Sequence, residues 1–381
     1  MNLPQDVEQK ILEVIGMPNL NRRNLSFYTK RLNKIRKQMY RLSDYFAKSE
    51  AAEEKYADAY FAYNFPMNLM KVMAIVKELR YIYPKTFRNK NKLRILDIGC
   101  GDGAGMFGLY LGFESSAAIS LTGYDVSRQM LMRCKELTKW LKNRHSNVSV
   151  KLLRRKISRG IFKKTTQKYN IILFANSLVE IFEEDEIRLQ FIEQVLKCTT
   201  NDGILIVIEP ALKKFSRRLM NLRQGIIEKQ RSYVLLPCLH KNVCPLLEIR
   251  KQKEWCHQSV SWEPPDFMKI LNQGLNREIN YLKFSYLVVS KKDYAKHFCN
   301  GFLAISHLLR EKGRKRCFLC TSNGRVELVR LDKSKSKLNM EFDNISKGDV
   351  IALKNIIQKK PHYWQIAENT HICILHHKGN Q

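Results

Sequence analysis

The sequence lacks any long run of apolar residues. No stretch approaches the ~18 uninterrupted apolar residues that a membrane-spanning helix needs, and the most apolar segments, such as YNIILFANSLVEIF and GILIVIEP, have the length of strands. We therefore exclude a membrane-spanning protein. The first residues, MNLPQDVEQKILEVIG, also lack the features of a secretory signal and the Arg-rich, acid-poor composition of a transit peptide. This absence predicts a cytoplasmic protein, and it favours thiols or metal ligands over disulfides for the ten cysteines.

Acidic residues are scarce. The chain of 381 residues has 36 Asp and Glu against 67 Lys and Arg, which gives a net charge of +31. An apolar fraction of 44% supports folded cores and excludes a wholly disordered basic tail. Such an excess of positive charge is most easily explained by a polyanionic partner. The length predicts two or three domains.

Basic residues cluster at 22–41, 151–164, 213–223 and 310–316. In the first cluster, apolar residues recur at steps of three or four, which predicts an amphipathic helix with bases on another face. The pattern favours binding of structured RNA, with a solvated helix face or an anionic membrane surface as alternatives. The candidate RNA-binding residues are Lys30, Lys34, Lys37, Arg41, Arg217 and Arg218.

Three regions differ in their pattern. Residues 1–88 predict a basic helical region, with an interruption at Pro66. Residues 89–298 alternate short apolar runs with polar helical stretches, which is typical of a parallel α/β sheet, and include a cysteine-rich segment at 234–265. Residues 299–381 predict a small β-rich C-terminal module. The expected fold is therefore α/β and Rossmann-like.

A glycine-rich loop follows the first apolar run at 93–98. Its sequence, DIGCGDGAG, satisfies the dinucleotide fingerprint G-x-G-x-x-A. Two details favour S-adenosylmethionine: an acid precedes the first glycine by two residues, and a third glycine follows at once. A second acid ends the next apolar run, where it can accept both ribose hydroxyls. The predicted cofactor-binding residues of a class I methyltransferase fold are Asp97, Gly99, Gly101, Gly103 and Asp125.

No residue is identified as catalytic. Enzymes that methylate exocyclic amines usually carry an Asn/Asp-Pro-Pro-aromatic loop after the fourth strand, whereas the corresponding segment here is FANSL. The sequence offers no evident general base. A fold does not establish an activity, and methyl transfer stays open at this point.

Cysteines gather in two places. Three lie in VLLPCLHKNVCPLLEIRKQKEWCHQS, at Cys238, Cys244 and Cys256, and two more form a C-x-x-C pair at Cys317 and Cys320. Three thiolates from an irregular segment, with a fourth from a distant one, suit either Zn²⁺ or a [4Fe–4S] cluster. Buried free thiols are the alternative.

These motifs occur in an order that resembles one family. The segments DAYFAYNFPMNLMKVMAIVKEL, DIGCGDGAG, ILIVIEP, PCLHKNVCPL with EWCHQS, FSYLVVS and RCFLCTSNG are similar to motifs of the methyltransferase-like small-ribosomal-subunit assembly factors of mitochondria, which have bacterial relatives. The resemblance extends from about residue 58 to about residue 350, and the cysteine segment is its most specific part.

The resemblance implies a function and a set of ligands. It implies an assembly or translation factor that binds small-subunit rRNA and the small ribosomal subunit, binds S-adenosylmethionine, and holds a [4Fe–4S] cluster. The implied ligands are Cys238, Cys244, Cys256 and Cys320, with Cys317 as the competitor for the fourth position. A catalytically active rRNA methyltransferase and a small-molecule methyltransferase are the alternative functions. We further expect a monomer away from the ribosome, in a bacterial cytoplasm or, if the source is eukaryotic, the mitochondrial matrix.

Overall fold

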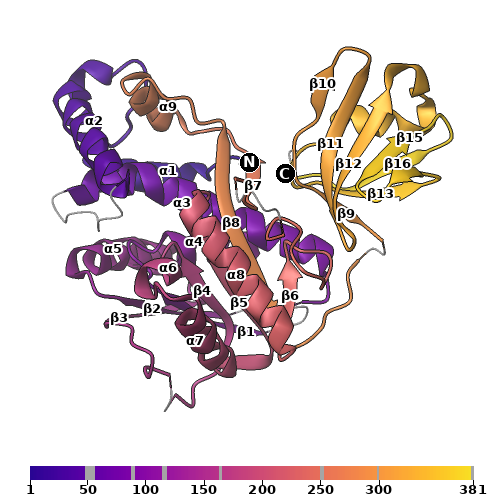
Figure 1. The fold of residues 1–381 in the computed structure, drawn as a ribbon. Helices are drawn as coiled ribbons and strands as arrows, with labels where there is room; N and C mark the ends of the chain where they lie inside the picture. The colour runs from indigo at the N-terminus through magenta and orange to yellow at the C-terminus, as the bar shows by residue number, and fades with distance from the viewer. Residues whose placement is uncertain are drawn as a thin grey trace. The chain divides into compact units, whose positions relative to one another are not determined.

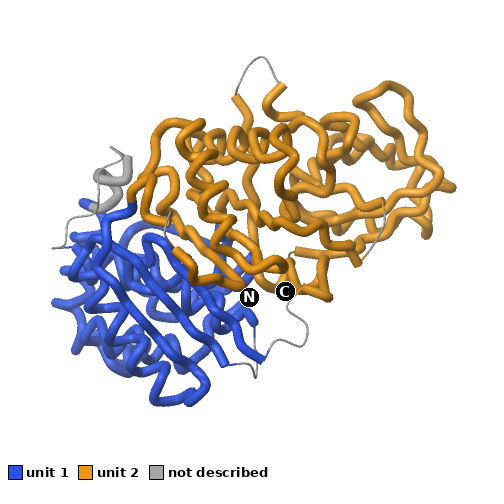
Figure 2. Tube along the Cα trace, turned by 90° about the horizontal axis from the view of Figure 1, so that it is seen from below, with its two compact units in different colours: residues 1–74, 91–157, 261–282 blue, residues 75–90, 158–260, 283–381 orange. Residues whose placement is uncertain are grey.

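The computed structural model describes residues 1–47, 56–86, 91–113, 118–162, 165–248, 253–297 and 300–378. Over these ranges, no helix combines the length and the apolar character needed to cross a membrane. The chain forms two compact units (Figure 2), one of residues 1–74, 91–157 and 261–282 and the other of residues 75–90, 158–260 and 283–381. The predicted division at residues 88 and 298 stays a prediction.

The N-terminal region is helical, as the spacing of its apolar residues predicts. It comprises α1 (Gln5–Val14), α2 (Leu25–Ala47) and α3 (Ala57–Ile82) (Figure 1). The interruption expected at Pro66 is wrong, because α3 continues through this residue. Proline removes one backbone hydrogen bond, but Phe65 and Leu69 on either side are fully buried. Burial of these side chains favours the continuous helix.

The first unit contains a parallel sheet in the order β3-β2-β1. Its strands are β1 (Lys92–Ile98), β2 (Ala118–Asp125) and β3 (Val148–Arg154), joined through α4 (Ala104–Phe113) and α5 (Arg128–Arg144), and α9 (Asp266–Gln273) also belongs to this unit. Both strand pairs are in parallel register. Gly108 lets α4 approach α3 closely, since a Cβ there would lie 2.6 Å from the carbonyl oxygen of Leu69. Because β1 and β2 run parallel, their carboxyl ends lie at the same edge of the sheet.

The second unit contains strands in the order β4-β5-β8-β6, with β7 paired to β8. The pair of β4 (Tyr169–Ala175) and β5 (Thr199–Pro210) is parallel, and β8 (Tyr281–Ser290) runs antiparallel to β5. The remaining elements are α6 (Leu178–Ile181), α7 (Asp185–Lys197), α8 (Lys213–Lys229), β6 (Tyr233–Leu236) and β7 (Gln258–Ser261). Apart from Asn170, β4 is apolar and nearly all buried, and so are residues 203–208 of β5, as strands covered on both faces are.

The C-terminal part of the second unit is a β-rich module, as predicted. Its strands pair in the order β14-β15-β12-β11-β9-β13-β16, with β10 on β11. They are β9 (Phe302–Ala304), β10 (Leu309–Glu311), β11 (Arg314–Thr321), β12 (Gly324–Leu331), β13 (Val350–Lys354), β14 (Ile357–Lys360), β15 (Tyr363–Ile366) and β16 (His371–His376), with the 3₁₀ helices η2 (Asp332–Ser334) and η3 (Lys337–Asn344). An apolar cluster that includes Leu319, Leu328 and Phe342 forms its core.

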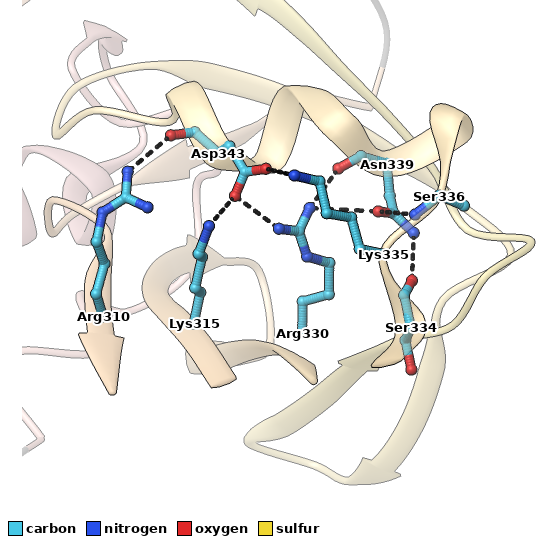
Figure 3. Close-up of polar contacts among 8 residues, drawn as sticks. All are labelled: Arg310, Lys315, Arg330, Ser334, Lys335, Ser336, Asn339 and Asp343. Atoms are coloured by element: carbon cyan, nitrogen blue, oxygen red, sulfur yellow. Dashed lines mark hydrogen bonds and ion pairs between the residues drawn. The ribbon is translucent and has the colours of Figure 1, made fainter. Parts of the chain in front are cut away.

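A charged cluster centred on Asp343 holds η3 against the strands (Figure 3). Its Oδ1 accepts hydrogen bonds at 2.6 Å from both Lys315 and Arg330, and Lys335 lies 3.4 Å from Oδ2. Burial would raise the pKa of Asp343, but the hydrogen bonds from Lys315 and Arg330 lower it to about 2. Lys315 of the fourth basic cluster is therefore used within the fold, as are Arg314 and Arg316, which pair with Glu311.

Candidate functional site

The glycine loop joins β1 to α4 in the first unit. Gly99, Gly101 and Gly103 all have positive φ, at 75°, 52° and 94°. L-residues with side chains rarely adopt these angles. A Cβ at Gly103 would also lie 2.8 Å from the Sγ of Cys134. The loop therefore needs glycine at this position for both its backbone and its packing.

Asp97 is a buried acid at the end of β1. Its side chain is 0% exposed, and neither carboxylate oxygen has a hydrogen-bond partner of normal geometry within the described residues. Burial raises the pKa of Asp97 to about 8, and the nearby charges of Asp125 and Asp102 act in the same direction. A carboxyl group in this environment gains stability from a cationic ligand, because a nearby positive charge restores its ionised form.

Asp125 ends β2 and closes the loop from the other side. Its Oδ2 accepts the N–H of Gly101 at 2.8 Å, and its Oδ1 accepts the N–H of Ser127 at 2.8 Å. The five predicted cofactor residues therefore belong to one loop and the two adjoining strand ends. Parallel strands with a glycine loop after the first and an acid at the end of the second are the arrangement of a class I S-adenosylmethionine-dependent methyltransferase. The predicted fold class is confirmed.

Two residues of this loop region were not predicted. Asp102 is 4% exposed, accepts the N–H of Ala104 at 3.3 Å, and has a pKa that burial raises to about 7. Cys134 approaches the loop from α5 and hydrogen-bonds the thiol of Cys100, which raises the pKa of Cys100. An acid two residues before a helix start is a capping signal, so Asp102 could have been found from the sequence. The position of Cys134 could not.

Four of the predicted thiols come together in the second unit. Cys238 and Cys244 lie after β6, Cys256 precedes β7, and Cys320 lies on β11. All four line one small cavity of about 20 Å³, together with Arg223 and His240. A neighbouring cavity of about 30 Å³ also touches the first three.

Cys317, the competitor for the fourth position, lies elsewhere. It is 0% exposed and belongs to the apolar core of the β-rich module, beside Leu319 and Val326. It does not line the thiol cavity. Side chains alternate between the two faces of a strand, and the separation of three residues therefore places Cys317 and Cys320 on opposite faces of β11.

Burial disfavours the ionised form of three of these thiols, those of Cys244, Cys256 and Cys320. Burial, with the charges of Cys238 and Cys244, raises the pKa of Cys256 to about 12, and burial likewise raises those of Cys244 and Cys320. The Nε2 of His240 lies 3.2 Å from the Sγ of Cys320. Burial lowers the pKa of His240 to about 4, so its imidazole is neutral.

The thiols are near one another but not in a finished coordination geometry. Across the described ranges, no three His, Cys, Asp or Glu side chains are arranged to hold a metal ion. The donor set itself consists of four sulfur atoms, which are the ligands that Zn²⁺ and iron–sulfur clusters take. The residues therefore fit such a centre in number and chemistry, and binding would have to draw the sulfur atoms together.

The predicted RNA-binding residues belong to two surfaces. On α2, Lys30, Lys34, Lys37 and Arg41 are exposed, and none forms an ion pair with a carboxylate that the structure describes. The opposite face of α2 buries Leu32, Ile35 and Met39. On α8, Arg217 and Arg218 are half-buried, and Arg217 donates to the carbonyl of Glu254 at 3.1 Å. Two bases of the second cluster, Lys163 and Lys164, lie outside the described residues.

Comparison with known proteins gives one matching family and many solved structures with low sequence identity to this chain. The sequence model described as mitochondrial small ribosomal subunit Rsm22 matches residues 54–351, more than three quarters of the chain. No curated protein matches the chain.

Among solved structures, the chain is similar to a protein of Listeria monocytogenes assigned to the class I S-adenosylmethionine-dependent methyltransferases. The identity is 14% and the TM-score 0.38, over 75% of this chain and 80% of that one. A methyltransferase from Pyrococcus furiosus is 15% identical with a TM-score of 0.33, over 57% of this chain and 83% of the other. At these values neither structure bears on the activity of this chain.

Proposed function

Because the chain belongs to the Rsm22 family of mitochondrial small-ribosomal-subunit proteins, we propose that it is an assembly or translation factor that binds small-subunit rRNA. In this proposal the methyltransferase scaffold binds S-adenosylmethionine at the glycine loop. A [4Fe–4S] cluster, or alternatively Zn²⁺, is held by Cys238, Cys244, Cys256 and Cys320. The family also supports the mitochondrial matrix as the place of action, whereas the bacterial cytoplasm stays a prediction.

The exposed basic face of α2 carries the proposal. Its four cations are spaced along one side of a helix and face solvent, while the other side is buried. Cations that are not paired with a carboxylate among the described side chains are free to contact phosphates, and each contact releases counterions from the nucleic acid. The net charge of +31 supports the same partner.

Removal of three charges from α2 tests the proposal. The variant Lys30→Ala/Lys34→Ala/Lys37→Ala is expected to weaken binding to small-subunit rRNA. The slope of log K against log salt should become shallower by about 2–3, because each lost phosphate contact contributes about 0.7–0.9. Fluorescence anisotropy between 50 and 300 mM salt, roughly the range in which phosphate contacts dominate, measures both quantities.

A matched control exists on α5. Lys135, Lys139 and Lys142 have the same spacing on a helix and are also exposed. The variant Lys135→Ala/Lys139→Ala/Lys142→Ala removes the same charge and should bind rRNA nearly as well as the unaltered protein. Equal weakening in both variants would mean that total charge, and not the face of α2, accounts for binding, and the assigned surface would be wrong.

S-adenosylmethionine is the cofactor that the glycine loop supports best. Asp97 and Asp125 contribute carboxylates from the two strand ends, and the positive-φ glycines let a ligand approach the start of α4. The cofactor carries a cationic end, which suits the buried carboxyl of Asp97. When bound, it would supply a transferable methyl group.

Cofactor binding should tighten as the pH rises from 5.5 towards 7.5. The pKa of Asp97 in the free protein is about 8, so the group is mostly protonated in this range, and a bound cation favours its ionised form. Binding then releases a proton, and the association constant should rise by up to about tenfold per pH unit. Calorimetry across this range measures the slope. The variant Asp97→Asn should bind weakly with little pH dependence, and a flat profile in the unaltered protein would contradict this role for Asp97.

Whether methyl transfer occurs distinguishes the proposal from its alternative, an active rRNA methyltransferase. At the end of β5, Glu209 accepts the N–H of Val179 at 3.0 Å, and burial raises its pKa to about 8. This acid therefore caps α6 and is mostly protonated near pH 7. Incubation of the protein with small-subunit rRNA and labelled cofactor should leave the RNA unlabelled, and stoichiometric labelling would establish the enzyme instead.

A further inference from the structure

Arg223 is a buried cation beside the thiol cavity. It lies on α8, is 1% exposed, and lines the cavity formed with the four cysteines. Its guanidinium donates to the carbonyl oxygens of Asn242 and His240 at 2.6 and 3.0 Å, and to the side chain of Gln224 at 3.2 Å. These carbonyls belong to the loop that carries Cys238 and Cys244. Arg223 therefore holds the backbone from which two of the thiols project.

Among the side chains that the structure describes, no acid balances the charge of Arg223. No carboxylate in the described part of the chain forms an ion pair with it, and all of its hydrogen bonds go to neutral oxygens. A guanidinium removed from water is costly unless an anionic group lies nearby. The positive charge of Arg223 favours the ionised forms of Cys244, Cys256 and Cys320, against the effect of burial on their pKa values.

Lys347 is a second cation beside the same thiols. Its Nζ lies 2.8 Å from the Nε2 of His257, the residue after Cys256, and within the described ranges it has no carboxylate partner. Its charge also favours the thiolate of Cys256. Two positive charges, one from α8 and one from the C-terminal module, therefore flank this group of thiols.

Four thiolates around Zn²⁺ or around a [4Fe–4S]²⁺ core carry a net charge of about −2 by the usual formal count. Formation of such a centre breaks four S–H bonds, forms four metal–sulfur bonds and releases four protons to solvent. The dianion would match the two flanking cations.

We propose that Arg223 and Lys347 are the counter-cations of a dianionic four-thiolate centre at Cys238, Cys244, Cys256 and Cys320. This inference rests on the thiolate centre of the proposed function and adds two positioning residues that act through charge. Arg223 has the larger role, because it is more deeply buried and also orients the loop of Cys238 and Cys244.

The variants Arg223→Met and Arg223→Lys test the role of charge. The protein is prepared anaerobically, its iron and zinc are measured, and loss of metal to a chelator is followed over time. Arg223→Met should lose metal about 10–100-fold faster than the unaltered protein, as is typical when a group outside the ligand shell is removed. Arg223→Lys should restore most of the retention of metal. Lys347→Met should change the rate of metal loss in the same direction as Arg223→Met.

The control Lys229→Met removes a cation from α8 that is already paired with Glu186 and Glu193. It should lose metal at the same rate as the unaltered protein.

A reduction potential separates charge from structure if the centre contains iron. Loss of a cation should shift the midpoint potential to more negative values, because the reduced cluster carries one more negative charge. A role limited to holding the loop would leave the potential unmoved. If circular dichroism shows that Arg223→Met does not fold, the metal retention and potential of Lys347→Met and Arg223→Lys test the inference instead.

The outcomes distinguish this inference from the proposed function. Unaltered protein that contains neither iron nor zinc would refute the thiolate centre itself. Unaltered protein that holds metal, with Arg223→Met and Lys347→Met retaining it equally well and at the same potential, would refute only the counter-cation inference. Faster loss in both variants with rescue by lysine at position 223 would support it.

Discussion

Lys378→Met is expected to lower the free energy of unfolding of the second unit by about 4 kcal/mol, since breakage of a buried ion pair typically costs 3–5 kcal/mol. The Nζ of Lys378 lies 2.5 Å from the Oε2 of Glu78, and both side chains are 1% exposed. Tyr286 donates a hydrogen bond to the same oxygen at 2.6 Å. Without the lysine, the buried Glu78 would lose its cationic partner and keep the hydroxyl group of Tyr286. Urea unfolding at pH 7 measures the change.

A double variant and a control variant test this expectation further. In Glu78→Gln/Lys378→Met both charges are absent, and much of the lost stability should return, because two neutral side chains of similar size remain. Lys335→Met removes an exposed lysine that lies 3.4 Å from Asp343, and it should change the stability by less than about 0.5 kcal/mol. A loss below about 1 kcal/mol in Lys378→Met would show that the pair does not hold this part of the fold together.

Cys320→Ser is expected to remove nearly all bound iron or zinc from protein purified without oxygen. A serine hydroxyl is a poor ligand for a soft metal centre, and three thiolates do not complete a four-ligand site. Cys244→Ser should have the same effect, and loss of a broad visible absorbance would report an iron–sulfur cluster. Metal analysis by mass spectrometry gives the stoichiometry.

Cys317→Ser is the matched control for Cys320→Ser. The two residues lie on the same strand, but Cys317 is buried in the apolar core of the β-rich module. Its replacement should destabilise the protein by about 1–2 kcal/mol, because a hydroxyl is buried there, and should leave the metal in place. The opposite result, with metal retained in Cys320→Ser and lost in Cys317→Ser, would overturn the assignment of the fourth ligand.

The glycine loop could be predicted because its parts are close in the sequence. A strand, three glycines and a helix start are contiguous, and Asp125 ends the next strand of a parallel sheet. Parallel neighbours present their carboxyl ends at one edge, so this juxtaposition follows from the fold class alone. Only the contact of Cys134 with Gly103 required the structure, because it depends on how α5 packs.

The helix expected to break at Pro66 shows where local rules fail. Proline lacks the N–H that a helix interior uses, and that argues for an interruption. The chain around it is strongly apolar, and the burial of Phe65 and Leu69 outweighs the lost hydrogen bond. Tertiary packing decided this element against its local propensity.

The thiol cavity shows both what the sequence by itself determined and what it left open. Side chains alternate along a strand, so Cys317 and Cys320 face opposite ways on β11. The sequence identified the cysteine segment but left these two residues as competitors for the fourth ligand position. It could not say which face of β11 meets the segment, because that depends on how the β-rich module packs. Arg223, and the pairing of Lys378 with Glu78 across 300 residues, were likewise decided by tertiary structure. Local pattern determines which groups a chain carries and how each strand or helix orients them, whereas only packing of the elements determines which of these groups meet.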